Sequence, residues 1–466
     1  MSILDKLKKG GKYITMLFEK DKLDESIIIE LINKHRNSDK IKYMIKGDNY
    51  YLGKNDILES INDDKKIKIP HSLFKNLVDE KVSYSFSNTP SLTCENEQIR
   101  ETITDIIGGD LGYDLESLAY EASKKGIAWV RPYISVNGEF KLFIAKSEQI
   151  IPGWKDATHT DLDYLIRVYD SEVFRFGKFK TVTNVEVWFA DEVRYYRLDG
   201  RQLIKINTDE GHFFKDGAPE NWGVVPWVAF KNNKVEVSDL TFVKKLIDSY
   251  DLSRSEVANF VDEVRNLIFV LKGYNGESLE EFLRDLKKYR GIKIDDDENA
   301  GVSTLNPTMD IAAIKQHYEQ IKRDIFDIGQ GVNRDLDKFG SAPSGVALKF
   351  LFSGLDLKNN QIESEFKRGF NQLIYFVYKY LETKNVSLQK EKIEIVFARD
   401  IPLNETEAIQ NCNNSRGIIS EETIIANHPW VRDVSSEIEK LKKEKEESGE
   451  LFNTAPTLEE GGDNEK

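Results

Sequence analysis

The sequence predicts an α+β protein in which a mixed helical and antiparallel β region precedes several long helices. Strand-like alternation of apolar and polar residues dominates residues 127–230. From Ser238 onward, apolar residues recur instead at the 3.6-residue period of a helix. The chain has 466 residues, more than one compact core usually supports, so we expect about two to four folded units.

Composition favours a folded chain and disfavours a conventional DNA-binding protein. Hydrophobic residues make up 40% of the chain, and only 11 prolines and 4 methionines are present. The net charge is −14, whereas proteins that hold nucleic acid statically are basic on the binding face. Acidity is still compatible with a channel through which DNA slides, because each neutralised phosphate would add affinity and hence friction.

The two cysteines, Cys94 and Cys412, lie far apart and predict neither a zinc site nor a disulfide framework. We expect both to be buried free thiols. The first residues carry three lysines without a following apolar run, and no later segment approaches about 18 uninterrupted apolar residues. These features predict a soluble protein made in the cytoplasm, with no membrane partner.

Helical spacing marks two segments near the N-terminus. Residues 21–36 form the first, and the second begins at Pro70. Between them we expect an extended piece that ends at Tyr50-Tyr51-Leu52-Gly53. A short helix should then run from Asp114 towards Gly126.

Strand patterns follow. Asn137-Gly138 lies between two β-like runs, residues 129–136 and 139–144, and is a strong signal for a two-residue hairpin turn. Alternation returns from Thr183, and a second strand leads back from Val193. We therefore expect residues 1–236 to form one mixed α+β domain.

Two long helices are predicted to bracket a small insert. Ser238 is a good N-cap for a helix of about 27 residues, roughly 40 Å long. The second helix carries a narrow apolar seam of the coiled-coil type, which is too short to stand alone and needs neighbours to bury it. The seam consists of Ile314, Tyr318, Ile321, Ile325 and Ile328.

The insert between these helices should contain a helix and short strands. The expected elements are a strand-like run at 268–271, a helix at 278–289, a strand at 292–294, an acidic turn at 295–298 and a return strand at 302–305. The two helices would then form a hairpin with a small domain at its tip.

After Gly331 the chain breaks for about a dozen residues and resumes as a helix from Val346 to about Thr383, with a possible bend at Ser353-Gly354. Apolar residues at 350–357 cover more than one face, which fits burial either against other chains or within the chain's own core.

The remaining chain is predicted as short elements. A strand at 391–397 could return to the N-terminal sheet, and helical patterns occupy 405–413, 420–425 and 434–447. Beyond Gly449 the composition is loop-like and predicts disorder.

The segment Gly340-Ser341-Ala342-Pro343-Ser344-Gly345 has the two-glycine spacing of a phosphate-binding loop. Val346-Ala347, however, stand where Lys and Ser or Thr are required, so the charge that steadies the phosphates is missing. Neither Ser341 nor Ser344 sits in a nucleophile elbow, and capping of the following helix is the better role for Ser344. We expect no catalytic residues and no cofactor.

Metal chemistry is also unsupported. The six histidines, which show no paired ligand spacing, are His35, His71, His159, His212, His317 and His428. The acidic run 295–298 lacks the spacing of a calcium loop, so a solvated turn is favoured. Arg334 and Lys338, in the break between the helices, could touch a phosphate backbone, although ordinary surface solvation is equally compatible.

Several stretches resemble one family, the portal or head-to-tail connector proteins of tailed phages, in the branch typical of long-tailed phages of Gram-positive hosts. The most specific is Gly340–Lys349, followed by Leu355-Asp356-Leu357-Lys358. The other matching residues are Tyr51-Leu52-Gly53 with Asp56-Ile57, Leu77–Tyr84, and Leu246–Asp251 with Ser255 and Ala258-Asn259. Together these stretches extend over roughly residues 45–385.

The resemblance implies a ring, usually of about twelve subunits, at one capsid vertex. It implies a portal fold with a mixed α/β wing, a helical stem, a small α/β clip, a long helix after a tunnel loop, and a helical crown. The implied parts are a wing at 1–236 completed by 346–402, stem helices at 237–264 and 311–332, a clip at 265–310, a tunnel loop at 333–345, a crown at 403–448 and a disordered tail at 449–466.

The resemblance also implies a function and partners. Double-stranded DNA would pass through the channel during packaging and ejection, while the terminase large subunit, which carries the ATP chemistry, docks at the clip. Head-completion or adaptor proteins would replace the terminase, and capsid and scaffolding proteins would surround the ring. The protein would be part of the virion, assembled in the host cytoplasm.

The tunnel loop would contain the candidate DNA-contact residues, which are Arg334, Lys338, Gly340, Ser341, Ser344 and Gly345. Its glycines would permit movement. Two other functions stay open from the residues alone: another phage assembly adaptor, such as a baseplate or tail protein, and a nucleic-acid enzyme, against which the missing lysine and metal spacing already count.

Overall fold

The computed structural model describes most of the chain as two compact units. The described residues are 23–60, 66–175, 177–206, 211–215, 217–264, 268–272, 278, 280, 284, 288, 301–305, 310–332, 345–399, 405–431 and 434–453. The larger unit comprises Met1–Asn333 with Gly354–Asp400, and the smaller unit comprises Arg334–Ser353 with Ile401–Lys466. Helices and antiparallel strands are mixed throughout the larger unit, so the predicted α+β class is confirmed.

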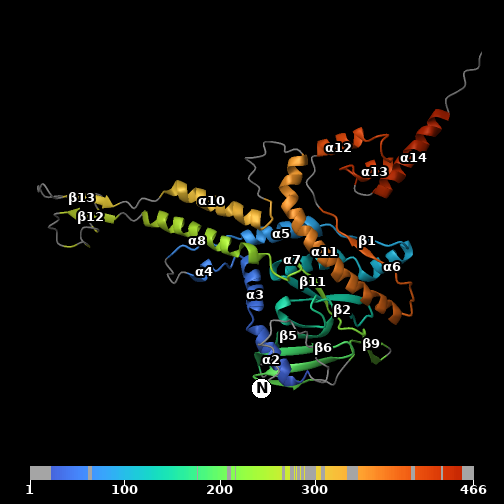
Figure 1. Ribbon diagram of the computed structural model, residues 1–466, viewed down its shortest axis with the longest axis horizontal. Coiled ribbons are helices and arrows are strands. Elements are labelled where there is room, and N and C mark those ends of the chain that lie inside the picture. Colours follow the sequence, from blue (N-terminus) through green and yellow to red (C-terminus); the bar gives the residue numbers. More distant parts are fainter. Residues whose placement is uncertain are drawn as a thin grey trace, which may run out of the picture. The chain divides into compact units, whose positions relative to one another are not determined.

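The helices of the larger unit occur in two groups, one before and one after a run of strands (Figure 1). They are α2 (Glu25–Arg36), α3 (Asp39–Tyr51), α4 (Ile57–Ser60), α5 (Leu73–Phe86), α6 (Glu97–Ile107), α7 (Leu111–Lys125), α8 (Leu240–Val264), α10 (Ile311–Ile328) and, from Gly354 onward, α11 (Gly345–Thr383).

The strands form several small antiparallel sheets. A five-stranded sheet has the order β4 (Ile150–Trp154), β5 (Leu162–Arg175), β6 (Lys178–Trp188), β7 (Val193–Asp199) and β8 (Gln202–Lys205). A three-stranded sheet has the order β11 (Val228–Lys231), β2 (Ile127–Ile134) and β3 (Phe140–Ala145). Three two-stranded sheets pair β1 (Ser91–Thr93) with β14 (Glu394–Val396), β9 (Phe213–Lys215) with β10 (Ala218–Glu220), and β12 (Ile268–Lys272) with β13 (Gly301–Leu305).

The predicted extended piece before Gly53 is wrong, because α3 occupies most of it. Ser38 caps this helix, since its hydroxyl accepts a hydrogen bond from the Ile41 amide. Gly47 lies in the middle of α3, where glycine weakens a helical pattern. A Cβ at this position would overlap the backbone carbonyl of Lys124 in α7, so glycine lets the two helices approach closely.

The predicted hairpin between β2 and β3 is confirmed, with a longer turn than expected. The Gly138 amide donates to the Ser135 carbonyl at 2.8 Å, and Ser135 itself donates to Glu139 at 2.8 Å. Gly138 has a φ of +76°, a conformation that glycine adopts without strain. The returning strand after Val193 is confirmed as β7, which pairs with β6.

Both faces of the five-stranded sheet are covered near β6. Val185 and Val187 pack with α2 on one face, whereas Trp188 belongs to a second cluster with Trp129 and Trp227 from the three-stranded sheet and the segment leading into it. The side chains of β6 therefore alternate between two faces that are both buried. They do not alternate between a buried face and a solvent-exposed one.

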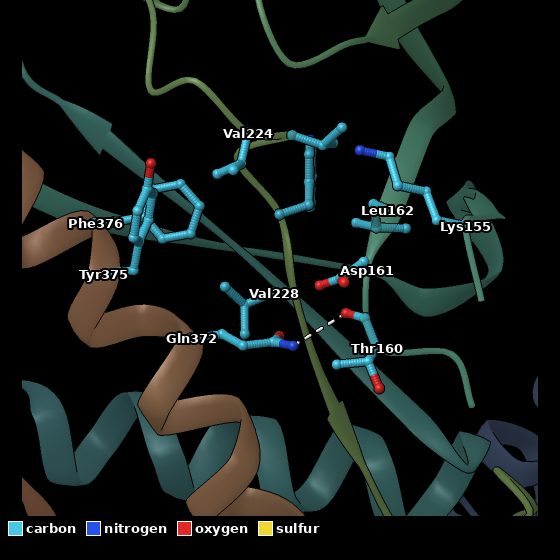
Figure 2. A pocket seen from close by; sticks show the side chains of 11 residues that line it. Lys155, Thr160, Asp161, Leu162, Val224, Val228, Gln372, Tyr375 and Phe376 are labelled. Carbon is cyan, nitrogen blue, oxygen red and sulfur yellow. Dashed lines mark hydrogen bonds between the residues drawn. The ribbon is translucent and has the colours of Figure 1, made fainter. Parts of the chain in front are cut away.

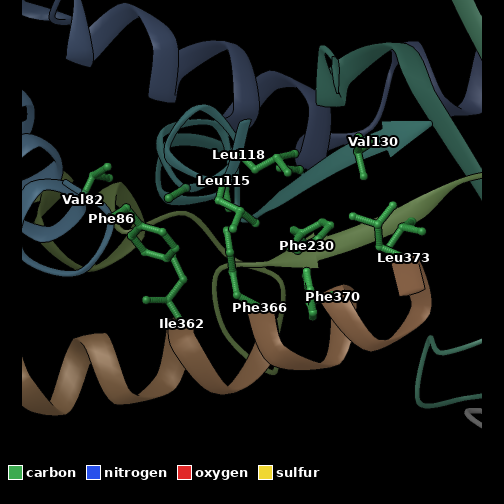
Figure 3. Packing of buried hydrophobic residues seen from close by; sticks show 14 of the residues in the cluster. Val82, Phe86, Leu115, Leu118, Val130, Phe230, Ile362, Phe366, Phe370 and Leu373 are labelled. Carbon is green, nitrogen blue, oxygen red and sulfur yellow. The ribbon is translucent and has the colours of Figure 1, made fainter. Parts of the chain in front are cut away.

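The main core lies where α11 covers the three-stranded sheet, α5 and α7. Figure 3 shows four side chains of α11 pointing towards Phe230 of β11 and Leu115 of α7. Spaced about one helical turn apart along α11, these residues are Ile362, Phe366, Phe370 and Leu373. Their burial fixes the middle part of the long helix, residues 362–373, to the sheet.

Helices α8 and α10 lie side by side and are joined at their far ends through the β12–β13 pair (Figure 1). Ser238 caps α8 as predicted, because its hydroxyl accepts from the Leu240 amide at 3.1 Å. Ile321 and Ile325 of the seam are buried in the main core, and Tyr318 packs on Tyr250 of α8. The seam thus has a partner within the chain, apart from Ile328, which is 54% exposed.

The tip of this hairpin agrees with the predicted insert as far as it is described. The strand-like run at 268–271 and the return strand at 302–305 form the β12–β13 pair. The predicted strand at 292–294 and the acidic turn at 295–298 lie outside the described residues.

The smaller unit contains the start of α11 and three helices, α12 (Glu405–Asn414), α13 (Glu421–Ala426) and α14 (Val434–Asn453). Helix α14 continues to Asn453, so the predicted loss of structure after Gly449 is wrong for its first residues, which contain no proline to end a helix. Residues 454–466 lie outside the described part of the chain.

Three further expectations have outcomes in the structure. The strand expected at 391–397 returns to the N-terminal region as β14, which pairs with β1. Of the apolar residues 350–357, Leu355 is 1% exposed and is buried within its own chain, whereas Phe350 and Leu357 are 77% and 60% exposed. Burial of these two against other chains stays a prediction. Both cysteines are free thiols, Cys412 buried and Cys94 only half-buried.

Among the described helices, none is both long and apolar enough to cross a membrane.

Replacing Phe370 with alanine should destabilise the larger unit by about 3–5 kcal/mol, because this ring is 0% exposed and its loss leaves a cavity between α11 and the sheet. The matched control, Phe179→Ala, removes a ring that is 72% exposed and should cost less than about 0.5 kcal/mol. Chemical denaturation measures both. Equal shifts in the two midpoints would contradict the assigned core.

Candidate functional site

Of the predicted tunnel loop, 333–345, Gly345 alone lies within the described residues. Arg334, Lys338, Gly340, Ser341 and Ser344 lie outside the described residues, as do the capping role expected for Ser344 and the proposed DNA contacts. Gly345 is the first residue of α11. The described geometry therefore concerns the base of the loop, where the chain leaves α10.

The loop base is packed too tightly for ordinary side chains. Helix α10 ends at Ile328, and a Cβ placed on Gly331 would overlap the side chain of Leu77 in α5. Gln330, between two glycines, has a φ of +54°, in the left-handed region that side chains rarely occupy. Contact with α5 thus determines the path by which the chain enters the loop.

A carboxylate of α5 fixes the last described residue of the base. The Val332 amide donates to Glu80 Oε2 at 2.7 Å, and the Val332 side chain is buried. A charge-assisted hydrogen bond of this kind is stronger than one between neutral groups. Glu80 therefore holds the start of the loop against α5.

A buried ionic cluster lies beside the loop base and joins three helices. Asp239, just before α8, is 2.9 Å from Lys81 Nζ of α5 and 3.3 Å from Lys358 Nζ of α11. Lys358 also donates to the Gly329 carbonyl at 2.8 Å, which ties α11 to the end of α10. Asn232 completes the cluster by donating to Asp239 and accepting from Lys81.

Burial and the attraction between opposite charges shift the pKa values of this cluster in opposite directions. Burial lowers the pKa of Lys81 to about 8, although Asp239 opposes the shift. Burial alone would raise the pKa of Asp239, but Lys358 and Lys81 outweigh it and lower that pKa to about 2. The carboxylate is therefore charged at neutral pH and holds both ammonium groups.

A second polar contact fixes the middle of α8. Residues 66–72, which we call the strap, lie along this helix. The amides of Ile69 and His71 donate to Ser255 Oγ and Asp251 Oδ1, each at 3.0 Å. Asn259, one turn further along, bonds both backbone groups of Ile67. Three side chains four residues apart thus bind an extended backbone.

Arg399 ties the segment after β14 to α11 and α5. Its guanidinium donates to Glu363 Oε1 at 2.9 Å and to Asp356 Oδ1 at 2.8 Å. The same carboxylates accept from Tyr84 and Ser85 of α5, both at 2.7 Å. Helix α11 is therefore fixed to α5 by ionic as well as apolar contacts.

Glu236 forms a further buried ionic site just before α8. It lies 3.1 Å from both Lys40 and Lys231 and accepts from His159 Nδ1 at 2.6 Å. Burial alone would raise the pKa of Glu236, but Lys40, the hydrogen bond with His159 and Lys231 outweigh it and lower the pKa to about 2. This site connects α3, the β4–β5 loop and β11.

A cleft of about 380 Å³ lies between α11 and the β4–β5 loop (Figure 2). Tyr375 and Phe376 form one wall, and Gln372 donates to the Thr160 carbonyl at 3.0 Å. Its two charged lining residues, Lys155 and Asp161, are exposed. We assign it a structural role, because no buried polar group converges on a ligand there.

The described residues contain no cluster of three or more His, Cys, Asp or Glu side chains that could hold a metal ion.

Sequence analysis missed the roles of Glu80, Lys81, Asp239 and Lys358. Three of them do lie in stretches that carry the family resemblance, Leu77–Tyr84 and Leu355–Lys358. Ser255 and Asn259, which hold the strap, lie in a third such stretch. The resemblance was therefore the one available signal, whereas spacing alone marks these residues as ordinary surface groups.

Replacing Gly331 with alanine should destabilise the fold by about 1–3 kcal/mol, because its Cβ would displace the buried Leu77 side chain. The control, Gly354→Ala, places a Cβ inside α11 with its nearest neighbours at 3.8 Å and should be neutral or stabilising by up to about 1 kcal/mol. Denaturation midpoints test both. A Gly331→Ala protein as stable as wild type would contradict the tight loop base.

Acid should destabilise the fold between about pH 4.5 and pH 2. Glu236 and Asp239 have folded pKa values of about 2, below the 4.5 and 3.8 usual for these side chains in an unfolded chain. Their stabilisation is present above the unfolded pKa values and is lost as pH falls through the folded ones. Glu236→Gln should lose about 1–3 kcal/mol at pH 7 and show a flatter acid decline, with exposed Glu59→Gln as the control. An unchanged decline would exclude this contribution.

Comparison with known proteins identifies the family. The family described as phage portal protein, SPP1 Gp6-like, matches residues 30–451. The portal protein of Clostridium phage phiCD119 is 32% identical over 427 residues, covering 85% of this chain and 91% of that protein. The portal protein of Bacillus phage SPP1 is 28% identical over 464 residues, covering 95% of this chain and 90% of that protein.

Among solved structures, a chain from the neck of an empty GTA particle is 10% identical, covers 76% of this chain and 88% of its own, and has a TM-score of 0.44. This score is too low for a comparison of individual elements. The family match over most of the sequence agrees with the α+β fold. The chain belongs to the phage portal protein family.

Proposed function

We propose that copies of this chain assemble head-to-tail into a ring at one capsid vertex, and that the ring is the channel for DNA packaging and ejection. Family membership supports this proposal. The structural observation that favours it is that five apolar side chains of the α8–α10 hairpin are left uncovered.

These side chains lie on α8 and on α10, whose buried residues are Ile321 and Ile325. The uncovered residues of the hairpin, which we call the hairpin strip, are Phe242, Leu252, Val261, Ile311 and Ile328, between 43% and 56% exposed. Apolar residues exposed at several positions along one hairpin provide a surface to which another protein can bind. A head-to-tail ring would cover them against a different face of the next copy, without a two-fold axis.

The proposed parts of the ring follow the described elements. Residues 237–264 and 311–332 would form the stem, because they contain α8 and α10. The pair β12–β13 would belong to the clip within 265–310. Residues 1–236 and 346–402 would form the wing, 333–345 the tunnel loop, and 403–448 the crown, which contains α12 and α13.

The proposed partners follow from these parts. The terminase large subunit would dock at the clip and supply the ATP-driven motion, because this chain lacks the phosphate-loop lysine at Val346. Head-completion or adaptor proteins would later take the same place, and capsid and scaffolding proteins would surround the wing. The chain itself would act as a structural component of the virion and not as an enzyme.

The tunnel loop would touch the moving duplex with few charges. Arg334 and Lys338 are its candidate contacts, flanked by Asp335 and Asp337. Weak net attraction suits a conduit, since a strongly basic loop would retard DNA by binding its phosphates. The anchored base at Glu80 would let the loop move while its start stays fixed.

Charged substitutions in the hairpin strip should prevent ring formation without unfolding the chain. Leu252→Glu with Ile311→Glu places carboxylates on partly exposed positions, so the monomer should lose less than about 1 kcal/mol. Val136→Glu, at a fully exposed turn, is the control and should form rings. Electron microscopy of the purified proteins is the measurement.

For the wild-type chain, the same images test the function itself. A ring with an axial channel wide enough for duplex DNA is expected. A closed or filamentous particle would contradict the portal function and would favour another assembly role.

Bulky residues at Gly340 and Gly345 should spare ring assembly but impair DNA packaging, because they restrict the backbone of the tunnel loop. The variants are Gly340→Val and Gly345→Val, and the readout is packaged DNA per assembled head. Gly109→Val, at an open position outside the loop, is the control. Normal packaging by both loop variants would count against the proposed role of the loop.

A further inference from the structure

A small pocket opens onto the buried ionic cluster beside the loop base. It has a volume of about 120 Å³, and Lys81, Asp239 and Lys358 contribute to its wall. The proposed function leaves this pocket unassigned. The charge of the pocket, the residues that line it and its volume together indicate which chemical group it binds.

The cluster carries one excess positive charge. Two lysines face one aspartate, which leaves a net charge of +1. Among the described residues, the recorded ion pairs of Lys81 and Lys358 are both with Asp239. The two lysine side chains are only 1% and 10% exposed, so water screens this charge poorly. Such a site favours an anion that can reach it.

The wall of the pocket is mixed, with polar side chains such as Asn233, Gln330 and Gln361 beside apolar ones. Three of its lining residues, Val235, Phe242 and Ile328, are 70%, 56% and 54% exposed. Two of them, Phe242 and Ile328, belong to the hairpin strip, which the proposed ring would bury. The pocket is therefore continuous with the proposed contact between subunits.

We propose that this pocket receives an aspartate or glutamate side chain from the neighbouring copy in the ring. This inference rests on the proposed function. The carboxylate would accept hydrogen bonds from Lys81 and Lys358, while the apolar residues of the wall exclude water from the pair. The chain's net charge of −14 makes acidic residues abundant on the facing copy.

The size of the pocket and the burial of its lysines favour an amino-acid side chain, and not duplex DNA, as the group that binds there. The pocket volume of about 120 Å³ equals a few water molecules of about 30 Å³ each, which suits one carboxylate group. A duplex presents its phosphates on a broad convex surface, which cannot reach two buried amines behind apolar residues. The same burial distinguishes these lysines from Arg334 and Lys338, the proposed DNA contacts.

Lys358→Met in the full-length chain tests the proposal. It removes the excess charge but leaves Asp239 paired with Lys81, so the monomer keeps a neutral buried pair. The control is Lys379→Met, which removes a lysine from the exposed side of the same helix, where it pairs with Glu382. Both variants change the net charge equally.

The measurement is ring dissociation on dilution, followed by mass photometry. We expect Lys358→Met to raise the half-dissociation concentration at least about tenfold, and Lys379→Met to leave it within about twofold. Lys358→Met also removes the hydrogen bond to the Gly329 carbonyl, so the melting temperature of its monomer, measured below that concentration, should fall while the fold is retained. Equal dissociation of the two variants would overturn the inference while leaving the ring intact.

A structure of the wild-type ring provides the second measurement, which decides the matter even if Lys358→Met fails to fold. We expect an acidic side chain of the neighbouring copy within hydrogen-bond distance of a lysine in the pocket. A pocket open to the channel, or filled by Asp335 or Asp337 of the same chain, would overturn the inference. If wild type forms no ring at all, the proposed function itself fails.

Discussion

The carboxylate of Asp239 is the interaction on which the architecture around α8 depends. It lies within ion-pair distance of Lys81 in α5 and Lys358 in α11, and Lys358 in turn holds the end of α10. Four helices distant in sequence therefore meet at one buried charge. Because an unpaired charge in this environment is strongly unfavourable, the helices must approach together, and the start of the tunnel loop is positioned as a consequence.

Other contacts hold the rest of the α8–α10 hairpin against the larger unit. The strap bonds the middle of α8, the main core buries Ile321 and Ile325 of α10, and Glu80 binds the backbone where the chain leaves that helix. Polar contacts set direction and register, whereas apolar burial supplies most of the free energy. The outer face of the hairpin keeps its apolar residues uncovered, and a ring subunit needs such a face to bind the next copy.

Most elements with a clear period could be predicted from the sequence, including α8 with its Ser238 cap, the β2–β3 hairpin and the seam of α10. Helix α3 could not, because Gly47 weakens its pattern and is explained only by close packing on Lys124. The cluster lysines were missed for a related reason. A lysine is usually exposed, and nothing local in the sequence shows that Lys81 and Lys358 share an aspartate more than a hundred residues away from either.

Denaturation of two variants tests the central role of Asp239 most directly. Asp239→Leu alone leaves two lysines buried without a carboxylate and should cost at least about 3 kcal/mol. The triple variant Lys81→Met, Asp239→Leu and Lys358→Met replaces the whole cluster with apolar side chains and should recover most of that loss. The account predicts a triple variant more stable than the single one. A single variant at least as stable as the triple would contradict it.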